Sequence, residues 1–169
     1  KAVTNGYLPL GGVMVGDKVG DVLVDKGGDF NHGLTYSGHP AACAAGLATL
    51  SIYKNSNIID NARSALGQHL QGKLAALADH PIVGEVRGQG MFAAVELVRH
   101  KSSKERLAPE SAGAEFCRDA AVANGLMVRA TGDAMIMAPP LVCSTAEIDV
   151  LAERFLVALD ATANHYGVP

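Results

Sequence analysis

The chain opens with KAVTNGYLPLGGVMVG at residues 1–16, and FNHGLTYSGHP follows at residues 30–40. The first segment begins with a lysine, its glycines and proline favour a loop, and its apolar residues 12–15 predict a short strand. The second segment is a hydroxyl-rich turn that ends at Pro40, a residue type favoured in the first helical turn because its missing N–H has no helical partner there. This order of lysine, loop and helix start suggests a covalently held, anionic cofactor.

The start of the helix expected from Pro40 to about Lys54 is a candidate anion site. Free N–H groups and the helix dipole favour a negative charge there by about 0.3–1 kcal/mol when the site is exposed. Thr35 would add a hydroxyl donor. The alternative is that Thr35 and Ser37 only cap the helix, and the local sequence leaves both interpretations open.

Four motifs occur in the chain in this order: KAVTNGYLPLGG, HGLTYSGHPAACAAGLATL, HPIVGEVRGQGMFAAVELV and GLMVRATGDAMIMAPPLV. Together they resemble the class III (ω-amino acid:pyruvate) aminotransferases, pyridoxal-phosphate enzymes of fold type I. The resemblance implies an α/β fold in which residues 1–57 end the large cofactor-binding domain and residues 58–169 form the small C-terminal domain. It also implies ping-pong transfer of an amino group from an amine or ω-amino acid to a keto acid such as pyruvate.

The resemblance places the Schiff-base lysine of the family at Lys1. An imine with pyridoxal 5'-phosphate needs a primary amine, which lysine supplies. Once freed, the same amine would move a proton from the substrate carbon to the cofactor. Without the later motifs, a lysine at this position would indicate only an exposed, mobile charge.

The resemblance further implies a homodimer with the cofactor site at the subunit interface. Thr35, and the backbone N–H groups of Thr35 and Leu34, would hold the phosphate of the neighbouring subunit's cofactor. Leu34 stands where the family usually has phenylalanine. This difference keeps the backbone donor but removes an aromatic wall from the entrance, so the preferred size of the amine donor is left open.

Arg129 is the expected substrate-binding residue. In the family, the arginine of this motif is a movable side chain that forms a two-pronged salt bridge with the substrate carboxylate. A planar, permanently charged guanidinium suits that task. The alternative from the residues alone is an ion pair between Arg129 and Asp133 across the turn at 130–132.

One rival motif is present at residues 88–93, where GQGMFA matches the dinucleotide fingerprint G-x-G-x-x-A. That fingerprint must open a helix after a strand, whereas strand-forming residues follow here. The glycines therefore predict a tight turn into a strand of the C-terminal domain, and a Rossmann site is rejected. Arg87 and Glu96 are expected to be buried or interface partners and not catalytic groups.

Hydrophobic periodicity predicts further helices at 17–25, 58–78 and 110–124 and one opened by Thr145, with strands at 126–129 and 134–138. Asp17 is expected to cap the first of these helices. One long helix at 58–78 is expected because a single apolar stripe runs along it, formed by Ile59, Ala62, Leu66, Leu70, Leu74 and Leu77.

Composition excludes several classes of protein. With 169 residues, 49% of them hydrophobic, the chain can bury a core, and its formal charge of −3 without a basic run gives no argument for nucleic acid. No stretch is long enough for a membrane span, and we expect a cytoplasmic protein. Cys43, Cys117 and Cys143 lack the spacing of zinc sites or disulfide frameworks, so we expect reduced thiols and no bound metal.

The chain begins without methionine, on the residue that the family places in mid-protein. We therefore expect the C-terminal part of a larger enzyme, because the family's phosphate loop, ring-stacking aromatic and ring-nitrogen aspartate have no counterpart here. Two alternatives to a transaminase are considered: a non-catalytic fragment that acts as a structural dimerisation module, and an aminomutase or decarboxylase-like branch of the same family.

Overall fold

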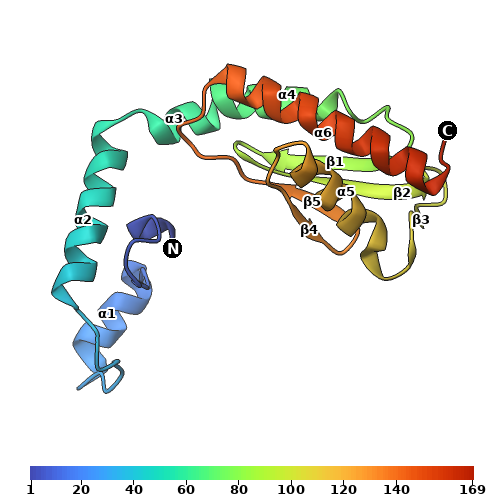
Figure 1. The fold of residues 1–169 in the computed structure, drawn as a ribbon. Helices are drawn as coiled ribbons and strands as arrows, with labels where there is room; N and C mark the ends of the chain where they lie inside the picture. Colours follow the sequence, from blue (N-terminus) through green and yellow to red (C-terminus); the bar gives the residue numbers. More distant parts are fainter. The chain divides into compact units, whose positions relative to one another are not determined.

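The computed structural model describes all residues from 1 to 169, in two units, Lys1–Asn57 and Ile58–Pro169. Figure 1 shows helices alone in the first unit and a sheet with helices in the second. The combination of helices with an antiparallel sheet agrees with the α/β class expected from the sequence. None of the helices combines the length and the apolar character that a membrane crossing requires.

The first unit is organised around its longest helix. Its helical segments are η1 (Ala2–Thr4), α1 (Asp17–Lys26) and α2 (Pro40–Asn55). Thr4 is buried and its hydroxyl donates to the Leu8 carbonyl at 2.6 Å, while the Tyr53 hydroxyl of α2 donates to the Ala2 carbonyl at 3.3 Å. These two bonds tie the opening turn into a fixed shape and fasten it to α2.

The strand expected at residues 12–15 does not form. A strand needs a neighbour to satisfy its backbone groups, and every strand of the structure belongs to the second unit. Val13 and Met14 are accordingly 90% and 99% exposed. The capping prediction for Asp17 is also wrong, because Gly16 holds the N-cap position and Asp17 is the first helical residue.

The sheet of the second unit is antiparallel and has the order β1-β2-β5-β4, with β3 paired to β2. Its strands are β1 (Val83–Gln89), β2 (Phe92–His100), β3 (Glu105–Arg106), β4 (Arg129–Thr131) and β5 (Ala134–Met137). Strands β1 and β2 form a hairpin whose turn contains Gly90 with a φ of 57°, which favours glycine. The segment that matched a dinucleotide fingerprint is therefore a tight turn that leads into a strand, as expected, and the pairing with β1 makes it a hairpin.

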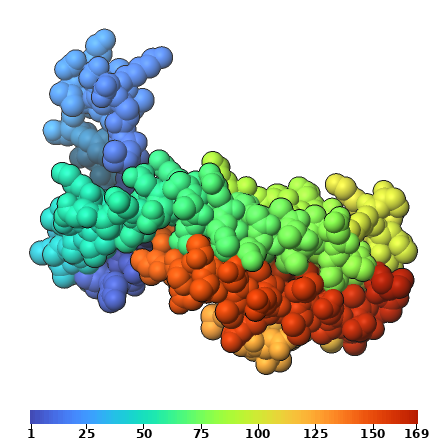
Figure 2. Space-filling model, turned by 90° about the horizontal axis from the view of Figure 1, so that it is seen from above, coloured from blue at the N-terminus to red at the C-terminus, as the bar shows by residue number.

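Four helices accompany the sheet: α3 (Ile58–Arg63), α4 (Ala65–Ala75), α5 (Ala112–Ala123) and α6 (Thr145–Tyr166). Helix α6 lies alongside α4 (Figures 1 and 2). Leu70 of α4 and Phe155 of α6 are completely buried in one core with Met135 of the sheet. Ser144 caps α6 through a capping box with Glu147, a device that fixes where a helix begins.

The single helix expected at residues 58–78 is broken at Ser64, which has φ −108° and ψ −109°. The Ser64 hydroxyl donates to the Asp60 carbonyl at 2.6 Å and so occupies a carbonyl at the end of α3. Beyond the break, Gly67 of α4 lies directly against the hairpin turn, since a Cβ built on it would be 2.7 Å from the Gly90 Cα. The apolar stripe predicted the buried face correctly but not the break within it.

Candidate active site

The face of the sheet away from the helical core presents the candidate substrate-binding side chain. Successive side chains of a strand point to opposite faces, and the core takes Ala93 and Met137 from the two central strands. Their neighbours in the strand therefore point the other way. One cross-strand row on this face runs from Arg87 through Ala94 and Ile136 to Arg129, according to the pairing of the four strands.

The two arginines of this row differ in their partners. The Arg87 guanidinium lies 2.8 Å from a carboxylate oxygen of Glu96 and 3.4 Å from a carboxylate oxygen of Glu85. Its charge is therefore neutralised within the sheet. The Arg129 side chain is exposed and makes no ion pair or hydrogen bond. Arg129 is therefore the cation of this row that can receive an anion.

The expected alternative for Arg129, an ion pair with Asp133, is wrong. The Asp133 carboxylate instead lies 3.0 Å from the Nε of Arg106, which comes from β3. The strand expected at 126–129 also begins only at Arg129, because residues 126–128 precede the pairing with β5. Local sequence suggested the nearer partner, whereas the fold supplies one from a distant part of the chain.

Arg129 opens onto a groove of about 370 Å³. The groove is lined by Phe92, Leu126, Met127, Val128, Arg129, Ile136, Met137, Ala138 and Leu151. Arg129 is the single charged residue in that set, and the others are apolar. An apolar lining with one precisely placed charge is typical of sites for small organic molecules.

Lys1 stands at the start of a tight turn. Its carbonyl accepts from the backbone N–H groups of Thr4 and Gly6, both at 3.1 Å, and Asn5 adopts a left-handed conformation within the turn. The Lys1 side chain is exposed, and its amine has no ion pair or hydrogen bond. The backbone is thus fixed while the amine stays free.

Thr35 belongs to a turn that precedes α2. Ser37 closes this turn, since its N–H donates to the Leu34 carbonyl at 2.9 Å and its hydroxyl accepts from the Leu34 N–H at 3.1 Å. The hydroxyl and N–H of Thr35 have no partner in the chain, so both are available to a ligand. The Leu34 N–H would have to exchange its Ser37 partner for a phosphate oxygen.

The capping alternative for this turn is also wrong. The ring of His39 holds the N-cap position of α2, and its Nδ1 accepts from the Ala42 N–H at 3.4 Å. Neither Thr35 nor Ser37 caps the helix. Sequence reasoning missed His39 because histidine is not among the residue types that usually cap helices.

The donor set fits an anionic aldehyde cofactor. An unpaired primary amine at Lys1 and an unpaired hydroxyl and N–H at Thr35 are the groups that an imine and a phosphate require. Lys1 and Thr35 belong to the first unit, and Arg129 belongs to the second.

The class-III aminotransferase family matches residues 1–159 of the chain. The chain belongs to the class-III aminotransferases. Putrescine–pyruvate aminotransferase of Pseudomonas aeruginosa is 45% identical over 163 residues, which are 96% of this chain and 35% of that enzyme. Gamma aminobutyrate transaminase 3 of Solanum lycopersicum, a chloroplastic enzyme, is 40% identical over 97% of this chain and 32% of its own.

Solved aminotransferases share the fold. An (S)-enantioselective omega-transaminase from Thermomicrobium roseum superposes with a TM-score of 0.87 at 44% identity, over 95% of this chain and 36% of that one. An omega transaminase from Pseudomonas jessenii, solved in complex with PMP, gives a TM-score of 0.79 at 37% identity, over 88% and 32%. The fold is therefore that of the fold type I transferases. The chain spans about a third of the length of the curated relatives it matches.

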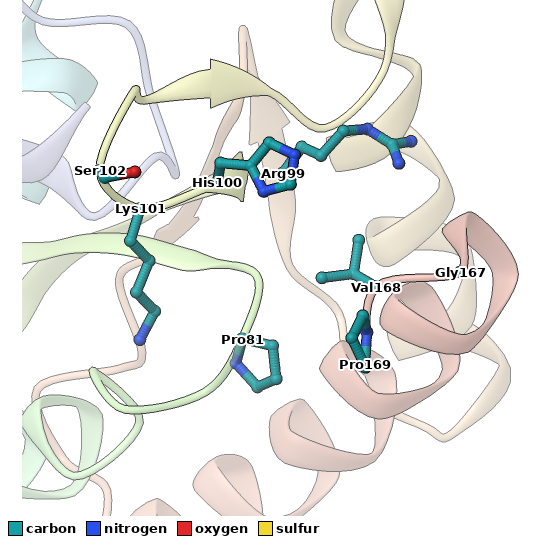
Figure 3. A pocket seen from close by; sticks show the side chains of 8 residues that line it. All are labelled: Pro81, Arg99, His100, Lys101, Ser102, Gly167, Val168 and Pro169. Atoms are coloured by element: carbon teal, nitrogen blue, oxygen red, sulfur yellow. The ribbon is translucent and has the colours of Figure 1, made fainter.

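A second hollow of this aminotransferase chain, of about 490 Å³, lies beside Arg99, Lys101 and the last residues of the chain. In Figure 3 the Arg99 side chain points away from Pro81, and the Lys101 side chain lies on the opposite side of Pro81 from Val168. Arg99 donates to the Leu107 carbonyl at 3.2 Å and to the Tyr166 carbonyl at 3.4 Å, while the Lys101 ammonium donates to the Ala78 carbonyl at 2.7 Å. These two cations hold backbone together, so this hollow is not an anion site comparable to Arg129.

Proposed function

We propose that this chain contributes to the active site of a pyridoxal-phosphate-dependent aminotransferase that moves an amino group from an amine or ω-amino acid to a keto acid such as pyruvate. Membership of the class-III aminotransferases supports the reaction class, and the named relatives support amine and keto acid substrates. The observation that carries the proposal is the unpaired guanidinium of Arg129 in an otherwise apolar groove. Such a groove takes a carboxylate with a carbon skeleton attached.

Arg129 would bind the carboxylate of the keto acid and fix its orientation. A guanidinium offers two parallel N–H donors to a carboxylate, which adds geometric specificity to the charge attraction. Because Arg129 is exposed and unpaired, no existing ion pair has to break when it binds. The same freedom lets the side chain move aside for an amine donor that has no carboxylate.

Lys1 would hold the cofactor and move the proton. When bound, pyridoxal phosphate supplies an electron-withdrawing ring that stabilises negative charge on the substrate carbon. The Lys1 amine would accept the proton of that carbon as a base and would then deliver it, as an acid, to the cofactor. Its backbone is held by the turn to Thr4 and Gly6, so only the flexible side chain has to travel.

Thr35 would donate its hydroxyl and N–H to the phosphate, with the Leu34 N–H as a further donor. We assign this phosphate to the neighbouring subunit of a homodimer, and we assign Lys1–Asn57 to the end of the large domain and Ile58–Pro169 to the small domain. The relatives named above are all aminotransferases. No observation therefore favours a purely structural module or an aminomutase.

The test is to replace Arg129 in the enzyme that contains this chain, loaded with pyridoxal phosphate. With a diamine donor, Arg129→Leu is expected to lower kcat/KM for pyruvate by about 100-fold, since loss of one partner of a close charge pair costs several kcal/mol. Arg129→Lys should lose less. Arg63→Leu is the matched control, because Arg63 lies in α3 and also has no ion pair. Unchanged use of pyruvate by Arg129→Leu would contradict the proposal.

A further inference from the structure

The groove beside Arg129 has an apolar wall, formed by Phe92 and Met127, that the proposed reaction with pyruvate does not use. Phe92 is 58% exposed and Met127 is 95% exposed, and both line the groove together with Arg129. Large apolar side chains that are grouped at the surface mark binding sites more often than scattered ones do. The groove therefore has a charged end and a larger apolar part.

Strand register gives the distance between these two parts. Ala94 and Arg129 both pair with Ile136, so they lie in one row across the sheet, two strands apart. Phe92 precedes Ala94 by two residues on β2. With strands ~4.8 Å apart and a rise of ~3.4 Å per residue, the Cα atoms of Phe92 and Arg129 are ~12 Å apart. Both side chains line the same groove of about 370 Å³, so a single ligand can contact the guanidinium and the phenyl ring together.

The position of Phe92 is held by helix α4. The Gln71 side-chain amide donates to the carbonyls of Gly90 at 2.9 Å and Phe92 at 3.2 Å. Gly67, one turn earlier, lies against Gly90. The exposed phenyl ring therefore stands on a turn that is bound at two points to the core, which lowers the cost of ordering the wall when a ligand binds.

We propose that Phe92 is a specificity-determining residue of the proposed transaminase and that it selects 2-oxo acids with unbranched apolar side chains longer than that of pyruvate. The carboxylate binds Arg129, and the far end of the side chain packs on the Phe92 ring. Pyruvate carries only a methyl group, so it is too short to cover the wall. Gln71 acts as a positioning residue, because it holds the backbone of Phe92. This inference rests on the function proposed above.

The test compares pyruvate with 2-oxohexanoate at a fixed amine donor, in the enzyme that contains this chain, loaded with pyridoxal phosphate. Phe92→Ala is expected to raise KM for 2-oxohexanoate and so lower its kcat/KM about tenfold, because an apolar contact in a pocket is worth about that factor. The kcat/KM for pyruvate should fall by a smaller factor, so the ratio of the two values changes. Phe92→Leu should retain most of the preference. Val122→Ala is the matched control, because Val122 is 54% exposed and lies on α5 outside the groove.

The positioning role of Gln71 has its own readout. Gln71→Ala should raise KM for 2-oxohexanoate by a smaller factor than Phe92→Ala, and it should raise this KM more than KM for pyruvate. Gln68→Ala serves as the control, since Gln68 lies on the same helix and its exposed side chain makes no hydrogen bond. Circular dichroism and thermal unfolding of each variant establish that it is folded.

The outcomes separate this inference from the function on which it rests. If Arg129→Leu impairs use of both acids and Phe92→Ala changes their ratio, both stand. If Arg129→Leu impairs both acids but Phe92→Ala affects them equally or not at all, the role of Phe92 is overturned and the transaminase proposal stands. If Arg129→Leu affects neither acid, both are overturned.

Discussion

Gly67 provides the sharpest test of the described packing. A methyl group at this position would lie 2.7 Å from the Gly90 Cα and inside the van der Waals envelope of the Ala62 carbonyl oxygen. Both neighbours are backbone atoms, so neither can rotate aside. The helix and the hairpin turn would have to separate, and overpacking of this kind costs about 1–3 kcal/mol, against at most about 1 kcal/mol gained from the higher helix propensity of alanine.

We therefore expect Gly67→Ala to lower the stability of the protein by about 1–2 kcal/mol, which corresponds to a fall in Tm of about 4–8 °C for a unit of this size. Gly72→Ala is the matched control on the same helix. Nothing lies within 4 Å of its Cβ position, so the substitution should raise stability by about 0.5–1 kcal/mol. Urea and thermal unfolding followed by circular dichroism measure both. If Gly67→Ala is as stabilising as Gly72→Ala, α4 does not lie against the hairpin turn.

Two further predictions concern titratable groups. Hydrogen bonds from Lys73 and His69 lower the pKa of Asp149. The stabilisation that the Asp149 carboxylate contributes is therefore complete above the ordinary carboxyl pKa of about 3.9. It is lost as the pH falls through the lower pKa that Asp149 has in the folded protein. Asp149→Asn should thus have a lower free energy of unfolding than the wild type at pH 7, and the difference should shrink below about pH 4. Urea titrations at several pH values measure it, and an equal difference at every pH would contradict this prediction. Burial raises the pKa of Cys117 to about 11. A thiol reagent at pH 8 should therefore label Cys117 only after the protein is unfolded in guanidinium. Rapid labelling of Cys117 in the native protein would show that this thiol is not buried.

Sequence reasoning predicted those elements whose signals are local. The helix from Pro40, the tight turn at Gly88 and Gly90, and the helix opened by Thr145 all carry their own start or turn residues. The break at Ser64 was missed because the apolar stripe continues through it without a change of spacing. Residues 12–15 have the composition of a strand but no neighbouring strand to pair with, and pairing is a property of the fold and not of the segment.

For the candidate site, the sequence predicted the residue types but not their partners. Arg129 was selected by resemblance, and the structure adds that its guanidinium is unpaired because Asp133 pairs with Arg106. Phe92 was not selected as a site residue, because it stands among strand-forming residues after the glycine turn and carries no chemical signal of its own. Its exposure follows from its place on the open face at the end of the hairpin, which depends on the register between β2 and β5.

The most direct test of the central claim is to identify the residue that carries the cofactor. The enzyme that contains this chain is incubated with pyridoxal phosphate, reduced with borohydride and mapped by peptide mass spectrometry. One stoichiometric pyridoxyl adduct is expected at Lys1 and should be absent from a Lys1→Ala variant, while Lys54, which is also exposed, remains unmodified. An adduct distributed over several surface lysines, or no adduct at Lys1, would contradict the account.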